Sequence, residues 1–352
     1  MAEPAVVPPK PISTWIRADH TRPYCARPWR QLTVLSDGDV ICACPDASKT
    51  NPLGNVFTSS VDEVWNGPAM ERLRRNIEED IDRVPVCRGC PNRLSTAPPK
   101  GFHTGVAKPR ALYIETVGGC NVECPGCNRE TIVGSRKRLA MTYDQYVKVV
   151  DELSPDLLYV EFYLAGENWA HPRAADMVKY TKDRNPRCLL QTSTNGLFFH
   201  TEERARAAVE SGIDCIVCSI DGSTQEVYEK GKIGGRLDVA LEGMRRLLRW
   251  RKELGRTQPL VIWRYLMFAW NTEPEQMDHT RRLAREIGVD HLAWHLNADR
   301  PELNSKRYYI GSPHLHEIAH ELWDTLPARL GWRDPVGLGS YPLPGQPNCA
   351  AP

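Results

Sequence analysis

The stretch GGCNVECPGCNRE, residues 118–130, places three cysteines on one short loop. Cys120, Cys124 and Cys127 follow the spacing Cys-x3-Cys-x2-Cys, and three thiolates this close in sequence can hold three irons of a [4Fe–4S] cluster. Because the cluster has four irons, one iron would keep an open coordination position. Zinc is the alternative, but a structural zinc site takes four protein ligands, and no nearby His or Cys supplies a fourth. The loop therefore predicts a reactive iron–sulfur cluster.

Short apolar segments alternate with amphipathic ones around and beyond this loop. Six segments read as strands, at 111–117, 157–164, 188–194, 214–220, 260–268 and 290–295. Helical patterns follow them at 142–153, 172–184, 202–211, 236–254 and 274–287. Six strand–helix steps predict a parallel sheet, either open or curled into a partial barrel.

Polar segments stand directly after three of these strands. AGEN (165–168) follows the second strand, STNG (193–196) the third and SIDG (219–222) the fourth. Parallel α/β sheets bind ligands at the carboxyl ends of their strands, so these segments and the cysteine loop are expected at one edge of the sheet.

Taken in this order, the motifs resemble the radical S-adenosylmethionine (SAM) superfamily over residues 107–300. The resemblance implies an α/β fold with a partial (β/α)6 barrel. It also implies an enzyme whose cluster binds SAM through the open iron and cleaves it reductively to a 5′-deoxyadenosyl radical. That radical takes a hydrogen atom from a substrate C–H.

The resemblance assigns roles to particular residues. Cys120, Cys124 and Cys127 would be the ligands of the catalytic [4Fe–4S] cluster that binds SAM. The implied SAM contacts are Gly166 for close backbone approach, Glu167 for the ammonium, Asn195, and Ser219 and Asp221 for the ribose. Two positions depart from the family pattern: Ala165 replaces its first glycine, and Gly126 stands where an aromatic residue often stacks on adenine.

Arg264 lies on the fifth predicted strand, between Trp263 and Tyr265. One face of that strand should look into the barrel, which makes Arg264 a candidate for the SAM carboxylate or for substrate. A packed strand with Arg264 paired to a carboxylate is the alternative interpretation.

A second cysteine group precedes the barrel. QLTVLSDGDVICAC predicts a hairpin around Asp37-Gly38, and residues 60–80 predict a helix that Gly67-Pro68 would interrupt. Five cysteines surround these elements, namely Cys25, Cys42, Cys44, Cys87 and Cys90. On spacing alone a zinc ribbon is an alternative.

The wider pattern CARPW…DGDVICAC…LGNV…EVWNG…CRGC, within 25–92, resembles the SPASM or twitch domain that carries auxiliary [4Fe–4S] clusters. The resemblance implies at least one such cluster, bound by Cys25, Cys42, Cys87 and Cys90, with Cys44 spare or replacing Cys42. Four protein ligands would suit electron transfer from a product radical, whereas an open position would suit direct substrate binding.

The predicted organisation is an N-terminal arm (1–24), the auxiliary module (25–96), a Pro/Gly-rich linker (95–109), the radical SAM core (107–300) and a C-terminal part (301–352). The last part should contain a helix near 313–327. The auxiliary module usually follows the barrel, and here it precedes it. PNCAAP (347–352) echoes PYCARP (23–28), so we expect either the start of a second, truncated or degenerate SPASM module or a coincidence.

Composition narrows the functional classes. Lys+Arg 45 against Asp+Glu 44 gives a net charge of +1, which predicts no broad basic surface for nucleic acid or an anionic membrane. The sequence has no apolar run of bilayer length and no signal-peptide pattern, so a cytoplasmic location is expected. In a reducing compartment, 12 cysteines indicate metal or redox chemistry rather than disulfides.

Other motifs have plainer interpretations. HEIAH (316–320) fits a zinc-hydrolase pattern, but no third ligand is evident, and surface histidines on a helix are the preferred interpretation. Cys215 and Cys218 are three apart on a strand and so should face opposite sides, buried like Cys188. Three roles stay open for Cys349: a cluster ligand, a hydrogen-atom donor, or a thiol without a function.

The expected function is hydrogen abstraction from a small hydroxylated substrate, a sugar or aminocyclitol, with dehydrogenation or epimerisation in a biosynthetic pathway. Rearrangement and cross-linking are further outcomes. Only 24 residues precede Cys25, too few for a winged-helix peptide-recognition domain. The alternatives are modification of a ribosomally made precursor peptide, a non-catalytic Fe–S or zinc protein, and a zinc hydrolase. A flavodoxin- or ferredoxin-type reductant is the implied partner.

Overall fold

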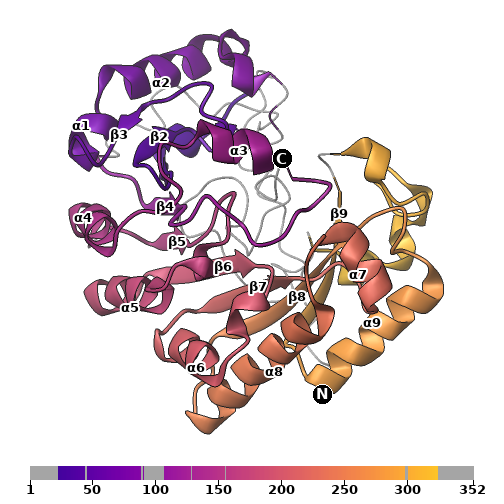
Figure 1. The fold of residues 1–352 in the computed structure, drawn as a ribbon. Coiled ribbons are helices and arrows are strands. Elements are labelled where there is room, and N and C mark those ends of the chain that lie inside the picture. The colour runs from indigo at the N-terminus through magenta and orange to yellow at the C-terminus, as the bar shows by residue number, and fades with distance from the viewer. Residues whose placement is uncertain are drawn as a thin grey trace, which may run out of the picture.

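The computed structural model describes residues 23–43, 46–88, 90, 107–127, 129–154, 156–297 and 300–323. Within these residues the strands form one nine-stranded sheet in the order β3-β2-β1-β4-β5-β6-β7-β8-β9 (Figure 1). The strands are β1 (Gln31–Val34), β2 (Asp39–Ile41), β3 (Gly54–Asn55), β4 (Ala111–Ile114), β5 (Tyr159–Glu161), β6 (Leu189–Thr194), β7 (Cys215–Ser219), β8 (Leu260–Met267) and β9 (His291–Leu296).

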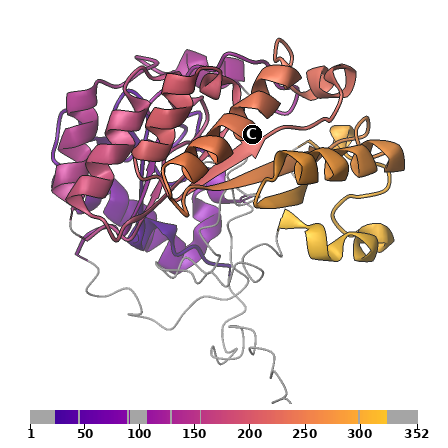
Figure 2. The same cartoon turned by 90° about the horizontal axis from the view of Figure 1, so that it is seen from below.

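Strands β4 to β9 pair in parallel and in chain order, as the six strand–helix steps predicted. Helices cover one face of the sheet, which Figure 2 shows from below. They are α4 (Tyr143–Leu153), α5 (Ala174–Arg184), α6 (Glu202–Glu210), α8 (Leu237–Glu253) and α9 (Pro274–Ile287), and two shorter helices, α3 (Arg129–Ser135) and α7 (Gln225–Gly231), lie in front of the strands in Figure 1. The expected partial (β/α)6 barrel, preceded by a small N-terminal module, is confirmed; α3 and α7 were not predicted.

The side of the barrel strands that faces the helices is apolar, whereas the inner side carries both apolar and polar side chains. Alternate strand residues such as Leu112, Val160 and Leu190 join the helices in the main core. Cys218 belongs to that core, whereas Cys215 belongs to a separate inner cluster with Trp323. The two cysteines are therefore buried on opposite faces, as the period-two geometry of a strand requires.

The N-terminal module is built from the predicted hairpin and two helices. Gly38 takes a φ of +85° at the turn between β1 and β2, a conformation that favours glycine. The helix expected over 60–80 is divided into α1 (Val61–Trp65) and α2 (Pro68–Asp80), because Gly67-Pro68 interrupts it. Ser60 and Glu63 form a reciprocal capping box at the start of α1.

The module joins the barrel through the sheet itself. β1 pairs in parallel with β4, from Gln31 opposite Ala111 to Val34 opposite Ile114. Just beyond β4, Glu115 accepts two hydrogen bonds from Arg136, and the Arg136 guanidinium also donates to the carbonyl of Ala47. The ion pair is fully buried and links the module to the first strand of the barrel.

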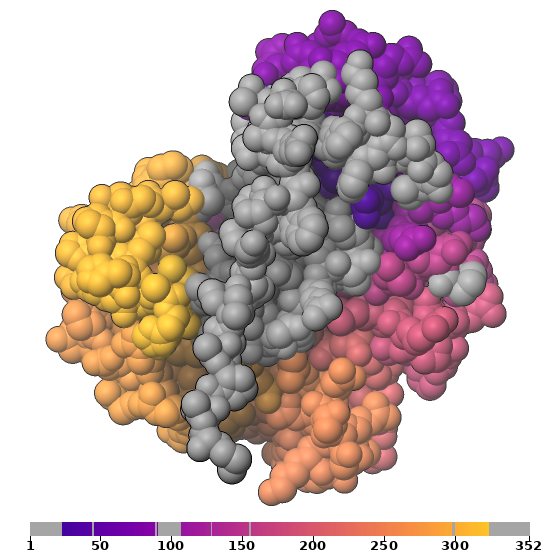
Figure 3. All heavy atoms as spheres, turned by 180° about the vertical axis from the view of Figure 1, so that it is seen from behind, coloured from indigo at the N-terminus to yellow at the C-terminus, as the bar shows by residue number. Residues whose placement is uncertain are grey.

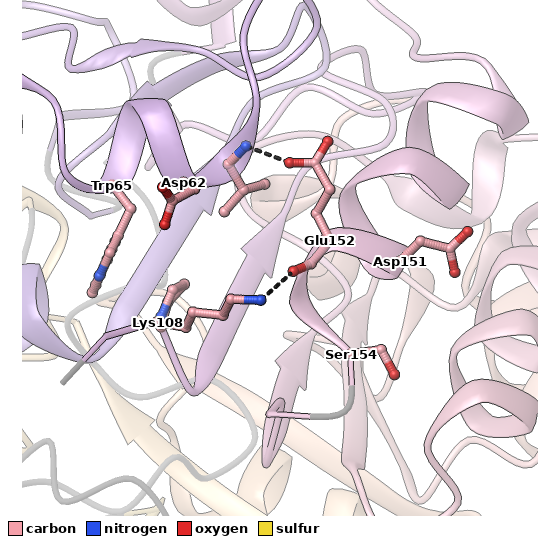
Figure 4. A pocket seen from close by; sticks show the side chains of 8 residues that line it. Asp62, Trp65, Lys108, Asp151, Glu152 and Ser154 are labelled. Carbon is pink, nitrogen blue, oxygen red and sulfur yellow. Dashed lines mark hydrogen bonds between the residues drawn. The ribbon is translucent and has the colours of Figure 1, made fainter.

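The helices of the two parts also meet. The carboxylate of Glu152 in α4 accepts from the amide of Val61, the first residue of α1. Figure 4 shows Glu152 beside Asp62, Trp65 and Lys108 around a hollow at this junction, and none of the cysteines lines it. The module (indigo to violet) and the C-terminal turns (yellow) lie on opposite sides of the face shown in Figure 3.

The C-terminal part differs from expectation. In place of a helix over 313–327, the chain forms two short 3₁₀ helices, η9 (Pro313–Glu317) and η10 (Ala319–Glu321). Ser312 caps the first, and the early proline favours a tight turn. Residues 324–352, and the arm up to residue 22, lie outside the described residues. No helix in the described ranges is long and apolar enough to cross a bilayer.

Candidate functional site

The cysteine loop leaves the end of β4 and is paired to a distant segment. The amide of Cys127 donates to the carbonyl of Cys124 at 2.9 Å, and Glu123 pairs with Ile233 in an antiparallel bridge. Burial raises the pKa of Cys120 to about 11, and the neighbouring Glu167, Cys124 and Cys127 add to this rise. The three thiols thus lie close enough to interact electrostatically, as ligands of one cluster must.

The donor set fits an iron–sulfur cluster with an open iron. Cys120, Cys124 and Cys127 are partly exposed thiols on one loop. In the part of the chain that the structure describes, no group of three or more His, Cys, Asp or Glu side chains is arranged to hold a single metal ion.

The AGEN segment packs directly on the backbone that precedes the loop. A Cβ on Gly166 would lie 1.9 Å from the carbonyl oxygen of Val117, so only glycine fits. The amide of Glu167 donates to the carbonyl of Gly119 at 2.9 Å. The expected close approach at Gly166 is thus made to the loop backbone, which fixes the AGEN segment beside the cysteines.

Asn168, which is not among the predicted site residues, holds the end of β4. Its side-chain oxygen accepts from the amides of Thr116 (2.9 Å) and Val117 (3.3 Å), and its Nδ2 donates to the carbonyl of Ile114 (2.9 Å). Asn168 is fully buried. Its place beside Glu167 in the AGEN motif was the signal that could have identified it.

Glu167 is buried against the end of β6. Its carboxylate accepts from the hydroxyl of Thr194 and from the amides of Trp169 and Asn195, the last at 2.8 Å. Burial raises the pKa of Glu167 to about 7, although these hydrogen bonds oppose the rise. The Nδ2 of Asn195 lies 3.7 Å from Sγ of Cys120. Two of the expected SAM contacts therefore stand beside the first cysteine.

Asp221 stands at the opposite side of the loop. Its carboxylate accepts from the amide of Leu266 at 2.8 Å and forms an ion pair with Lys232 at 2.5 Å. Burial lowers the pKa of Lys232, but Asp221 and Cys124 outweigh this and the net pKa is raised. Lys232 belongs to the segment GKIGG (231–235), and it brings a buried positive charge close to Cys124.

Ser219 and Arg264 form a third group, inside the barrel. Arg264 donates to the hydroxyls of Ser219 (2.9 Å) and Ser193 (3.0 Å). The structure thus brings together Cys120, Glu167 and Asn195, and separately Asp221 and Cys124. Ser219 is the last residue of β7 and lies opposite Arg264 of β8, two residues before Asp221.

The auxiliary module gathers four cysteines around one small cavity. Cys25, Cys42, Cys87 and Cys90 line it, and Arg27, Pro28, Ala43, Ile77 and Ile81 complete its wall. Burial raises the pKa of Cys42 well above its usual value, and Asp46, Cys87, Cys25 and Cys90 each add to the rise. Four thiols around one apolar cavity suit a [4Fe–4S] cluster with a full set of protein ligands.

Two further cysteines and the HEIAH motif lie away from both cysteine groups or outside the described residues. Cys44 and Cys349 lie outside the described residues. The HEIAH histidines, His316 and His320, are exposed and fall on separate 3₁₀ helices, so they do not share a helical face. Glu317 between them is held by Arg307, which lowers its pKa to about 2. The predicted surface position is confirmed, but the predicted helix is wrong.

Two family models match the chain. Residues 25–91 match the SPASM iron–sulfur cluster-binding domain, and residues 114–251 match the radical SAM superfamily. The chain belongs to the radical SAM superfamily and carries its SPASM domain on the N-terminal side of the radical SAM domain. Its cofactors are SAM with a [4Fe–4S] cluster and an auxiliary SPASM iron–sulfur cluster, and such enzymes need a reductant and a substrate.

Several solved structures are similar to this chain over part of its length. Methylornithine synthase (PylB) is 16% identical with a TM-score of 0.40, and the match covers 52% of each chain. BtrN in complex with AdoMet and 2-DOIA is 26% identical with a TM-score of 0.28, covering 31% of this chain and 45% of BtrN. SuiB of Streptococcus suis bound to its precursor peptide SuiA is 12% identical with a TM-score of 0.47, covering 86% of this chain and 69% of SuiB. The chain thus spans about half the length of the first two. No curated protein matches the chain.

Proposed function

We propose that the protein oxidises a small hydroxylated substrate, of sugar or aminocyclitol type, by radical dehydrogenation. With its cluster and SAM bound, the site at Cys120, Cys124 and Cys127 supplies a 5′-deoxyadenosyl radical that takes one hydrogen atom from a substrate C–H. The hydroxyl group of the resulting carbon radical then gives its proton to water, the unpaired electron passes to the auxiliary cluster, and a carbonyl forms.

The observation that carries this proposal is the set of four thiols around the auxiliary cavity. Cys25, Cys42, Cys87 and Cys90 provide a protein ligand for each iron, which leaves no position for substrate and suits electron transfer. An enzyme that removes two electrons needs an acceptor for the second one. Epimerisation returns a hydrogen atom to the carbon and needs no such acceptor, so the complete ligand set favours dehydrogenation.

The residues around the cysteine loop support the first half of the reaction. Asn195 and Glu167 stand beside Cys120, where they can orient SAM toward the barrel. Asp221 and Lys232 hold the other side of the loop. The inner face of the barrel offers polar side chains, including Gln191, Ser193 and Ser219, which suit a substrate rich in hydroxyl groups.

The test is anaerobic turnover of the reconstituted protein with dithionite and SAM, with 5′-deoxyadenosine measured by mass spectrometry. Wild type should form it and Cys124→Ala should not, while Cys188→Ala, which removes a buried thiol far from the loop in sequence, should retain activity. A panel of deuterated sugars and aminocyclitols should then transfer deuterium into 5′-deoxyadenosine.

Variants of the auxiliary cysteines distinguish dehydrogenation of the substrate from the other reaction outcomes. Cys87→Ala should still form 5′-deoxyadenosine but lose the carbonyl product, because the second electron has no acceptor. Full product formation by Cys87→Ala would contradict the dehydrogenase proposal. Deuterium transfer from a precursor peptide, and from none of the sugars or aminocyclitols, would replace it with peptide modification.

A further inference from the structure

Arg264 carries a buried charge that nothing in the described chain neutralises. Its side chain is 7% exposed, and its hydrogen-bond partners are the neutral hydroxyls of Ser193 and Ser219. Among the residues that the structure describes, no carboxylate pairs with it, and its Nη1 has no hydrogen-bond partner. A buried, unpaired guanidinium destabilises the fold unless a ligand compensates its charge. The sequence-based alternative, an Arg264 paired within a packed strand, is therefore not what the described residues form.

A second unsatisfied group lies beside it. His295 is 2% exposed, and its Nδ1 has no partner in the described part of the chain. The indole of Trp323 lies 5.8 Å from the Arg264 guanidinium and 5.8 Å from the His295 ring, so the three side chains form one group. Burial, and then the charge of Arg264, hold the pKa of His295 well below its usual range. The imidazole is therefore neutral, and Arg264 gives the group a single positive charge.

The position of this group separates it from the cysteine loop. Ser193 of β6 is two residues before Asn195, which follows the strand, and Ser219 is two residues before Asp221. Arg264 is likewise two residues before Leu266, whose amide donates to Asp221. Since two strand residues advance the chain about 7 Å, Arg264 lies one layer deeper in the barrel than the side chains that face the cysteines.

We infer that Arg264, Ser193, Ser219 and His295 form a subsite for a carboxylate of the substrate. Within the proposed class the substrate is then a sugar acid rather than an aminocyclitol, so this inference deepens the proposed function and rests on it. A planar guanidinium edge with a free N–H suits a carboxylate, and one positive charge matches one negative charge. The hydroxyls of Ser193 and Ser219 accept from Arg264 and keep their own protons to donate to the same ligand.

The test uses the reconstituted holoprotein and acetate as the probe, with acetamide as its neutral counterpart. Binding is measured by ligand-observed NMR, with and without saturating SAM. We expect acetate to bind about tenfold more tightly than acetamide whether or not SAM is present. R264Q should lose about tenfold in acetate affinity, and R264K should retain part of it. The affinity for SAM should change less than about twofold in R264Q.

R281Q is the matched control. Arg281 also lies over a tryptophan, Trp294 at 5.3 Å, but Glu321 and Asp278 neutralise it. R281Q should bind acetate like wild type. Iron content and circular dichroism establish that each variant is folded. If R264Q fails to fold, the double variant S193A/S219A takes its place, with an expected loss of about threefold in acetate affinity.

Three results would overturn the inference. Acetate binding no tighter than acetamide binding would mean that no carboxylate subsite exists. Acetate that binds only without SAM, together with weakened SAM binding in R264Q, would assign Arg264 to the SAM carboxylate. Unchanged acetate binding in R264Q or in the serine double variant would place the anion elsewhere. Because acetate binding needs no turnover, a failure to form 5′-deoxyadenosine would contradict the proposed function and leave this result unchanged.

Discussion

The amide of Glu123, inside the cysteine loop, donates to the carbonyl of Ile233 at 3.0 Å, and the amide of Ile233 donates back to the carbonyl of Glu123 at 2.9 Å. This exchange joins the loop to a segment about 110 residues later in the chain. Lys232 immediately precedes Ile233, so the same pairing positions its ammonium between Asp221 and Cys124. The pairing therefore fixes both the shape of the loop and the charge beside it.

Replacing Lys232 should change the reduction potential of the SAM-binding cluster. Lys232→Met removes a buried positive charge next to Cys124, so the cluster should accept an electron less readily. We expect its potential to become more negative by on the order of 50 mV, measured by a redox titration followed by EPR. Lys230→Met removes an exposed charge nearby and is the control.

A double variant that also changes Asp221 tests whether the charge of Lys232 sets the reduction potential of the cluster. Lys232→Met leaves Asp221 buried without its ion-pair partner, whereas the double variant with Asp221→Asn restores neutrality. The double variant should return most of the way to the wild-type potential. A Lys232→Met potential equal to that of Lys230→Met would contradict the electrostatic role of Lys232.

Asn168→Ala should destabilise the protein. It removes two acceptor contacts and one donor contact at the end of β4 and leaves buried amides of Thr116 and Val117 without a partner. We expect a loss of about 2–4 kcal/mol in the free energy of unfolding, measured in urea. Asn66→Ala removes one exposed contact to Asp62 and should cost less than about 0.5 kcal/mol. Equal losses in the two variants would argue against Asn168 as the residue that holds β4.

Cys42 and Cys44 should differ in their effect on iron content. Cys42 lines the auxiliary cavity with three other cysteines, so Cys42→Ala should lose about four irons per chain after reconstitution. Cys44→Ala should keep the full iron content and an unchanged EPR spectrum of the reduced auxiliary cluster. Iron loss from Cys44→Ala, with retention in Cys42→Ala, would exchange the roles of the two residues.

Protonation of His171 should lower the free energy of unfolding of the protein in mild acid. Its Nε2 contacts the carbonyl of Met141, and its Nδ1 accepts from the amide of Arg173, so protonation of Nδ1 breaks a hydrogen bond. Burial lowers the pKa of His171 below its ordinary value near 6.5. The unfolded chain therefore binds this proton more readily than the folded one. Stability is fully present above about pH 6.5 and falls as the pH drops below it.

The measurement is chemical unfolding of the protein at several values from about pH 7.5 to 5.5. His171 should contribute a slope of at most about 1.4 kcal/mol per pH unit. His171→Asn keeps a side-chain acceptor for the amide of Arg173 but does not titrate, so its slope should be smaller. His295, whose pKa is also lowered, contributes a slope that remains in both proteins. Identical slopes in wild type and variant would refute this assignment.

The sequence by itself determined what depends on neighbours along the chain. The Cys-x3-Cys-x2-Cys spacing, the turn at Gly38 and the break at Gly67-Pro68 are set by a few adjacent residues. Hydrophobic periodicity located all six barrel strands and the helices α4, α5, α6, α8 and α9, because an element of regular period must place one face against the core. The short helices α3 and α7 carry too few turns for that signal.

The tertiary structure alone decided which distant segments meet. The pairing of β1 with β4, the approach of Lys232 to the cysteine loop and the group of Arg264, His295 and Trp323 depend on strand register and on long connections. The 3₁₀ turns at 313–321 replace an expected helix, and the chain that follows them makes a bridge from Leu322 to Trp294 of β9. No local pattern records such contacts, because their energy arises only when the whole sheet has formed.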